Sequence, residues 1–159
     1  MKLIKVLLVA IAMAIPSVAF AITDSENIEF ITALGNGDIQ VVQQFMDRGV
    51  NINGADFAWS PLQIAANAGQ LEIVKLLAEH GADLNYKHPI TKMTALGLAA
   101  YNGFPGIVQF LLSKGADPNI KMRGGVSIVR AVRDTGNTEM VDLLLKGGAM
   151  DDGCEGKCN

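Results

Sequence analysis

A short glycine-centred motif returns four times along this chain. Its glycines are Gly37, Gly69, Gly103 and Gly136, which lie 32, 34 and 33 positions apart. After an apolar stretch, a second glycine follows each of them at Gly49, Gly81, Gly115 and Gly148. Repetition at such a period is typical of solenoids, in which units stack in a line without a closed core. The sequence therefore predicts a stack of similar units with an extended surface.

The third unit shows what each unit is made of. Thr94 can cap a helix over 95–102, because its hydroxyl accepts a hydrogen bond from an otherwise unbonded backbone N–H. Gly103 allows the positive φ that ends this helix. Apolar residues at helical spacing over 107–112 predict a second helix, which Gly115 ends. Two such helices cannot bury their own apolar faces, so we expect each unit to pack against the next.

Two segments, 60–85 and 94–119, resemble the ankyrin repeat almost residue by residue, and the resemblance extends over 26–150. It implies an all-α fold: an ankyrin-repeat solenoid of four stacked helix-turn-helix units with short extended loops. The expected divisions are a signal peptide at 1–21, a leader at 22–27, repeats at about 28–55, 56–88, 89–121 and 122–150, and a cysteine-containing tail at 151–159.

The chain departs from the family pattern in ways that bear on structure. Gln63 and Gly97 stand where the family usually has histidine, so we expect an altered hydrogen-bond network in the turns. Unit four aligns with unit three in two ways. Either Ser127 is the cap, or residues 131–132 correspond to the double alanine at 99–100 and one extra residue lies before Gly136. Terminal units of a solenoid face water on one side and are commonly atypical, so degenerate ends fit a complete array of four.

The first residues have the pattern of a secretory signal peptide. Lys2 and Lys5 precede an apolar run at 6–15, and small residues flank the expected cleavage point in 19–21. The alternative is a retained membrane anchor, but the apolar run is shorter than the roughly 20 residues that span a bilayer. Without an Asn-x-Ser/Thr acceptor in the sequence, we expect a bacterial source and a periplasmic location, with secretion as a further possibility.

Charge limits the partners that we expect. Loss of Lys2 and Lys5 leaves 11 basic and 16 acidic residues, a net charge of −5. The sequence shows no basic stripe, so nucleic acid is a poor candidate. We expect a protein partner, no membrane association after cleavage, and a monomer when the partner is absent.

The resemblance to ankyrin repeats implies that a partner binds the concave side, formed by loop tips and the exposed faces of the first helices. The expected anchors there are Phe57, Trp59, Tyr86, His88, Met93, Tyr101 and Asn102. The expected polar rim is Asp56, Asn67, Lys87, Lys92 and Arg123. Phe57 or Trp59 could instead cover the core of unit one. The loop from Asn85 to Thr94 spans nine positions against seven from Asn53 to Ser60, which indicates either a projecting binding loop or neutral drift.

The sequence lacks the residues of a catalytic site. Of its two histidines, His80 falls at a helix end, where it would act as a cap, and His88 falls in a loop, where we expect it to be exposed. We find no nucleophilic triad, phosphate-binding loop or zinc-ligand spacing. We therefore expect no enzyme activity, no cofactor and no metal site.

The tail contains both cysteines of the sequence, Cys154 and Cys158. In an exported protein the simplest expectation is a disulfide closing a small loop. Copper binding or redox exchange by the same pair is an alternative function, and a secreted effector that binds a host protein is another. The leading prediction is a non-enzymatic periplasmic binding module: a scaffold, a protector of an exported enzyme, or a toxin-neutralising protein.

Overall fold

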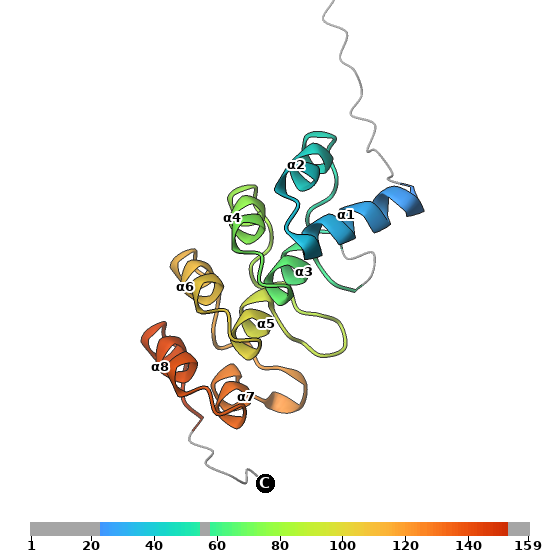
Figure 1. Cartoon of the computed structure of the whole chain (residues 1–159). Helices are drawn as coiled ribbons and strands as arrows, with labels where there is room; N and C mark the ends of the chain where they lie inside the picture. The colour runs from blue at the N-terminus through green and yellow to red at the C-terminus, as the bar shows by residue number, and fades with distance from the viewer. Residues whose placement is uncertain (1–22, 55–57, 153–159) are drawn as a thin grey trace, which may run out of the picture.

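The computed structural model describes residues 23–54 and 58–152, and the regular elements in these ranges are all helices. They are α1 (Asp24–Asn36), α2 (Ile39–Asp47), α3 (Pro61–Asn67), α4 (Leu71–Glu79), α5 (Ala95–Tyr101), α6 (Pro105–Ser113), the 3₁₀ turn η1 (Arg123–Gly125), α7 (Ile128–Asp134) and α8 (Thr138–Lys146). Consecutive α-helices form four stacked helix-turn-helix units (Figure 1). The predicted all-α solenoid is confirmed.

Hydroxyl caps set the start of α3, α5 and α7. Ser60, Thr94 and Ser127 accept hydrogen bonds from backbone N–H groups three residues later, at 3.2, 3.1 and 3.2 Å. Each cap satisfies a donor that the helix itself leaves unbonded. Since Ser127 caps α7, the first of the two alignments of unit four is the one observed.

The turn between the two helices of a unit needs a glycine for two reasons at Gly69. Its φ is +78°, in the left-handed region that side chains other than glycine rarely adopt. A Cβ atom at this position would also lie 2.7 Å from the ring of Phe104, the residue that directly precedes α6 in the next unit. Gly69 therefore serves both the turn and the close stacking of units, whereas at Gly136 only the positive φ of +78° calls for glycine.

The helices form two layers. The first helices α1, α3, α5 and α7 stack in one layer and the second helices α2, α4, α6 and α8 in the other, while the long loops extend from the first layer on its far side (Figure 1). Small residues allow the close contact between α3 and α5: Ala65, Ala66, Ala99 and Ala100 are all 1% exposed or less. Leucines such as Leu62 and Leu96 are buried in a continuous core that includes residues of both layers.

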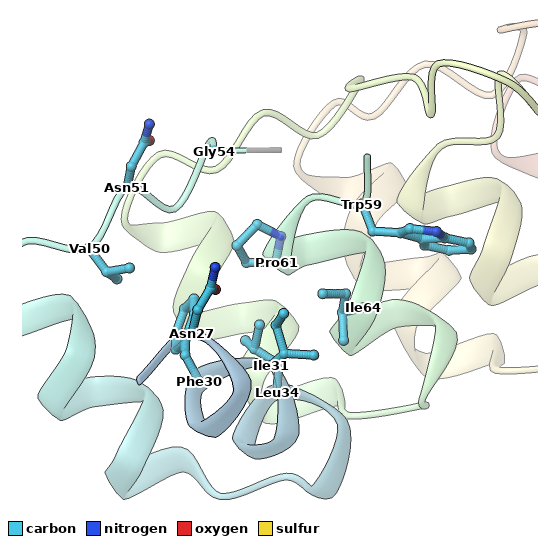
Figure 2. A pocket seen from close by; sticks show the side chains of 10 residues that line it. All are labelled: Asn27, Phe30, Ile31, Leu34, Val50, Asn51, Gly54, Trp59, Pro61 and Ile64. Carbon is cyan, nitrogen blue, oxygen red and sulfur yellow. The ribbon is translucent and has the colours of Figure 1, made fainter. Parts of the chain in front are cut away.

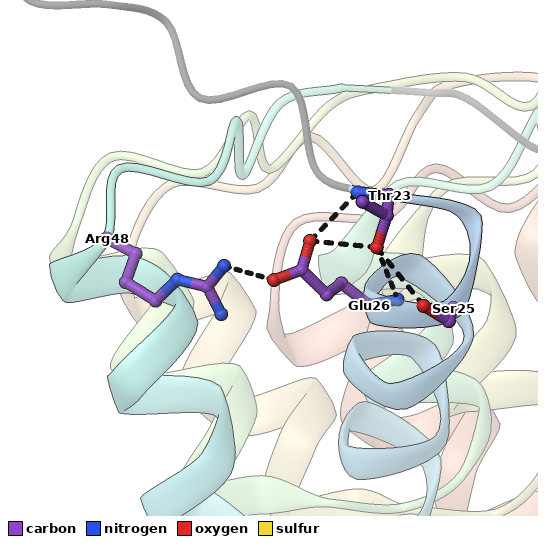
Figure 3. A network of polar contacts seen from close by, with 4 residues as sticks. All are labelled: Thr23, Ser25, Glu26 and Arg48. Carbon is purple, nitrogen blue, oxygen red and sulfur yellow. Dashed lines mark hydrogen bonds and ion pairs between the residues drawn. The ribbon is translucent and has the colours of Figure 1, made fainter.

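The N-terminal helix begins earlier than the range 28–55 expected for unit one. Thr23 and Glu26 form a reciprocal capping box, so α1 already begins at Asp24, within the segment expected to be a leader (Figure 3). The Glu26 carboxylate also pairs with Arg48, which follows α2. The backbone N–H of Thr23 and then the Arg48 guanidinium lower the pKa of Glu26 to about 2. This cap was not predicted from the sequence.

Two expectations concern residues outside the described ranges: the signal peptide at 1–21, and the pairing of Cys154 with Cys158. Among the residues that the structure does describe, we find no helix with the length and apolar character needed to cross a bilayer.

Candidate partner-binding surface

Asparagine side chains fix the loops of successive units to one another. Asn53 Oδ1 accepts a hydrogen bond from Asp83 N at 2.8 Å and its amide donates to Gly81 O at 3.1 Å. Asn85 Oδ1 accepts from Asp117 N at 2.8 Å. Asn119 Oδ1 accepts from Met150 N at 2.8 Å. We call these contacts the asparagine ladder: Asn53, Asn85 and Asn119 each bind backbone of the following unit. The loop surface is therefore ordered before any partner binds.

Gln63, in the family's histidine position, also bonds one unit to the loop of the next, here from the layer of first helices. Its Oε1 accepts from Ser60 N at 3.1 Å, which completes a capping box. Its amide nitrogen donates to the carbonyl oxygens of Met93 at 2.7 Å and Tyr86 at 3.3 Å. The side chain is 0% exposed. Gln63 thus connects α3 to both ends of the loop that precedes α5. These bonds are the altered hydrogen-bond network that we expect where glutamine stands in place of histidine.

The expectation that His88 is exposed is wrong. Its side chain is 6% exposed, and its Nδ1 accepts hydrogen bonds from Ile90 N and Thr91 N, both at 3.3 Å. Two backbone bonds, His88 N to Met93 O and Lys92 N to His88 O, close the loop around it. Buried polar groups require such partners, and a histidine ring in this loop supplies them. His88 therefore shapes the loop from inside.

Trp59 packs on His88 with the ring centroids 5.0 Å apart in an edge-to-face arrangement. The ring is half-buried and points away from Phe30 and Leu34 of unit one (Figure 2). Tyr86 joins the same group, because its hydroxyl donates to Ala58 O at 3.3 Å. These contacts tie the loop before α3 to the loop before α5, and both aromatic side chains stay partly open to solvent.

A hollow lies between unit one and the loop that leads to α3. Its walls come from Asn27, Phe30, Ile31, Leu34, Val50, Asn51, Gly54, Trp59, Pro61 and Ile64 (Figure 2). Its volume of about 30 Å³ is far below the roughly 300 Å³ of a small-molecule pocket. Two expected site residues, Asp56 and Phe57, fall in 55–57, outside the described residues.

Tyr101 and Asn102 are exposed at the end of α5, as the sequence predicts. The Tyr101 side chain is 52% exposed. Asn102 donates from Nδ2 to the side-chain oxygen of Asn67 at 3.0 Å and to the Asn67 carbonyl at 3.2 Å. This bond between adjacent units holds two of the expected site residues in fixed positions beside the exposed tyrosine.

The remaining expected site residues belong to the loops before α5 and α7. Lys87 and Lys92 are exposed, and Met93 is half-buried at the base of its loop. Arg123 is exposed in η1, and its backbone N–H donates to Thr91 O at 2.8 Å. The two loops are therefore in direct contact, which the spacing of the residues in the sequence does not reveal.

The distribution of charge is a feature that was not predicted. Residues 84–133 contain seven Lys or Arg residues and a single acid, Asp117, whereas 23–83 contain nine acids and two basic residues. The net charge of the chain conceals this division. A count over windows of the sequence would have found it.

Over the described residues there is no group of three or more His, Cys, Asp or Glu side chains that could hold a metal ion. His80 has the helix-end position expected of a cap, with Nδ1 at 2.8 Å from Leu76 O. Its ring therefore has a structural role. The arrangement can bind and orient a partner.

A family model described as "Ankyrin repeats (3 copies)" matches residues 30–122. The chain is 38% identical over 118 residues to Ankyrin repeat and SAM domain-containing protein 6 of Rattus norvegicus, covering 70% of this chain and 13% of the relative. It is 32% identical over 116 residues to Ankyrin repeat and KH domain-containing protein mask-1 of Caenorhabditis elegans, covering 73% and 4%.

A third relative is Ankyrin repeat, SAM and basic leucine zipper domain-containing protein 1 of Dasypus novemcinctus, 30% identical over 131 residues that cover 80% of this chain and 28% of the relative. The chain thus spans less than a third of the length of these relatives, and none of the three has an enzyme's name. Ankyrin repeats are generally modules for protein–protein interaction. By its helical repeats and by these matches, the chain belongs to the ankyrin repeat family.

Proposed function

We propose that this chain is a non-enzymatic binding module that presents the loops and the ends of its first helices to a partner protein. The observation that supports it most directly is Tyr101, a large aromatic side chain that is 52% exposed beside the fixed pair of Asn67 and Asn102. Tyrosine on an ordered surface is typical of interface anchors, because it loses little conformational entropy on binding.

Preorganisation supplies the mechanism. The asparagine ladder, Gln63 and the buried His88 ring already hold the loops in place. Ordering such loops at the moment of binding would reduce affinity, since each immobilised side chain costs about 0.5–1.5 kcal/mol. A patch of about 800 Å² on each partner suffices for a specific complex. Four stacked units offer a continuous surface on which such a patch can form.

Photocrosslinking from position 101 tests the proposal. A photoreactive phenylalanine analogue replaces Tyr101 in living cells, and mass spectrometry identifies the trapped protein. The same analogue at Gln109, exposed on α6 in the other layer, is the matched control. We expect capture from position 101 alone, followed by saturable binding of the purified partner that Tyr101→Ala weakens at least about tenfold, as for an interface anchor.

Equal capture from both positions would contradict this surface. So would a purified partner whose affinity for Tyr101→Ala equals its affinity for the wild-type protein. Far-UV circular dichroism of Tyr101→Ala checks that the fold is intact, as expected for an exposed side chain.

We also propose that the module is exported and acts in the periplasm. The pattern of charged, apolar and small residues in 1–21 supports export, and a bridge between Cys154 and Cys158 would suit an oxidising compartment. Cell fractionation, with N-terminal sequencing of the mature protein, tests this part. A cytoplasmic protein that retains Met1 would overturn it. Thiol titration of the exported protein reports on the bridge.

A further inference from the structure

We propose that Lys87, Lys92 and Arg123 form a cationic ridge that binds an acidic segment of the partner protein. The proposal rests on the proposed function and adds to it the chemistry of the partner. The sequence places these three residues at the polar rim of an aromatic site. The proposal gives them a different role, which is to select the partner.

Backbone hydrogen bonds bring the three residues together. Lys92 N donates to the carbonyl of His88, the residue after Lys87. Arg123 N donates to Thr91 O at 2.8 Å, and Thr91 precedes Lys92. The three cations therefore belong to backbone segments bonded to one another. Figure 1 shows the two loops side by side, next to α5 and α7 and away from α6 and α8.

The charges of the ridge are open to solvent. Lys87, Lys92 and Arg123 are all exposed, and among the described residues no carboxylate forms an ion pair with any of them. Three like charges on adjacent segments repel one another, and an acidic ligand would relieve that repulsion. Complementary charge of this kind speeds association and selects among partners.

The backbone of Lys92 gives an independent reason to assign the ridge a function. Its φ is +60°, in the left-handed region. Glycine or asparagine adopts this conformation at lower cost than lysine. Residues held in such conformations are concentrated at functional sites. A lysine at this position places a charge at the contact between the two loops, which a glycine would not do.

Lys121, two residues before Arg123, and Arg133 of α7 pair with carboxylates of this chain. Lys121 Nζ lies 3.8 Å from Asp152 Oδ2, and Arg133 lies 2.8 Å from Asp151 Oδ2. The hydroxyl of Ser127 and, after it, the charge of Lys121 lower the pKa of the Asp152 carboxyl. The C-terminal segment thus places two consecutive aspartates against basic side chains of the last two units. Its two aspartates pair with Lys121 and Arg133 and leave the ridge open.

An acidic protein segment suits this surface better than nucleic acid. The ridge is short, and the nine acids in residues 23–83 would repel a phosphate backbone that extended along the stack. Apolar side chains also adjoin the ridge: Ile90 is 63% exposed at the tip of the longer loop, and Met93 is half-buried at its base. A peptide with carboxylates around an apolar residue matches both features.

Fluorescence anisotropy with a defined probe tests the proposal. The probe is a fluorescein-labelled peptide of aspartates with one central leucine, and its control has asparagine for every aspartate. The variant is Lys92→Asn with Arg123→Gln, because asparagine tolerates the left-handed backbone and the Arg123 N–H is retained. A control for the loss of positive charge elsewhere is Lys114→Gln, which removes one positive charge beside Phe110 at the end of α6, in the other helix layer.

We expect the acidic peptide to bind the wild-type protein and the Lys114→Gln variant equally. The double variant should bind it about tenfold more weakly, the effect of losing two exposed ion pairs. Binding should also weaken as salt shortens the range of the charges. Equal affinity for the aspartate and asparagine peptides would overturn the proposal, as would unchanged binding by a folded double variant.

A further arm uses labelled oligothymidylate. Binding of this probe more tightly than the acidic peptide, with loss in the same double variant, would assign the ridge to nucleic acid and overturn the proposal. The proposed function fails separately. A partner trapped at position 101 that lacks an acidic segment and binds the double variant normally would preserve the binding module and eliminate the role of the ridge.

Discussion

At the scale of single residues, Gln63 is a polar and fully buried side chain that joins two units. Gln63 bonds to Ser60 in its own unit and to Tyr86 and Met93 in the loop that leads to the next. Its removal would lose these hydrogen bonds and would also leave the Ser60 N–H and the Tyr86 carbonyl without their partner, whereas Met93 O would keep the N–H of His88. Gln63 is therefore more important to stability than its neutral side chain suggests.

Replacement of Gln63 by alanine should lower the free energy of unfolding by about 2–4 kcal/mol, the sum of a lost cap and of the lost hydrogen bonds to the Tyr86 and Met93 carbonyls. Urea denaturation followed by circular dichroism measures the change. Gln109→Ala, on an exposed position of α6, should change stability by less than about 0.5 kcal/mol. If the two variants were equally stable, the bridging role assigned to Gln63 would be wrong.

The sequence was sufficient to predict residue roles where the role is local. Thr94 is a cap because it directly precedes an apolar helical run, and Tyr101 is exposed because of its place at a helix end. His88 was misjudged because its partners, Trp59 and the backbone of its own folded loop, depend on how two units approach each other. A loop position in the sequence does not specify which side of the loop faces inward.

At the scale of elements, α1 differs from the other first helices in having thirteen residues against seven in α3, α5 and α7. Its extension depends on the Thr23–Glu26 capping box and on the ion pair of Glu26 with Arg48 (Figure 3). Among the described residues, α1 packs on one neighbouring first helix, α3, whereas α3 and α5 each pack on two. The cap therefore replaces part of the support that a preceding unit would give.

Acidification should release this cap. The pKa of Glu26 is about 2 in the folded chain, below its ordinary value of 4.5. Because it is lowered, the stabilising contribution is complete above about 4.5 and is lost as the pH falls toward 2. Hydrogen exchange at the amides of α1 should accelerate in that window. Glu26→Gln should remove most of the dependence, whereas Glu29→Gln, exposed on the same helix, should retain it.

Exchange rates in Glu26→Gln that followed the wild-type pH profile would contradict the role of this carboxylate.

The boundaries of the helices show how much of the fold a sequence pattern can predict. Glycine spacing and apolar periodicity located each helix pair, but the start of α1 needed the geometry of a side-chain cap, which one threonine and one glutamate among many do not reveal.

At the scale of the whole molecule, stability comes from contacts between neighbours. Each helix layer packs unit on unit, and the asparagine ladder repeats the same bond at each interface between loops. In such an array the free energy of folding is nearly a sum of unit terms and interface terms. The repeat period was sufficient to predict this architecture. The contact between the loops before α5 and α7 was not predictable, because it arises only after the units stack.

Asn85→Ala removes the central rung of the ladder, the bond to Asp117 N. We expect a loss of about 1 kcal/mol and a broader urea transition with a lower m-value, because the two halves of the stack separate in stability. Asn119→Ala removes the last rung, near the chain end, and should leave the transition sharp. A single transition of unchanged slope in Asn85→Ala would show that helix packing alone couples the halves.

The ladder has a mechanical consequence. Asn53, Asn85 and Asn119 each form hydrogen bonds with the unit that follows. A pulling force applied to the two chain ends therefore acts on these bonds, and on the helix packing beside them, at each boundary between units. Under tension such an array extends like a spring and then gives way one unit at a time. A bound partner that contacts the loops of several units would resist this extension, and it would do so without changing the structure of any single unit.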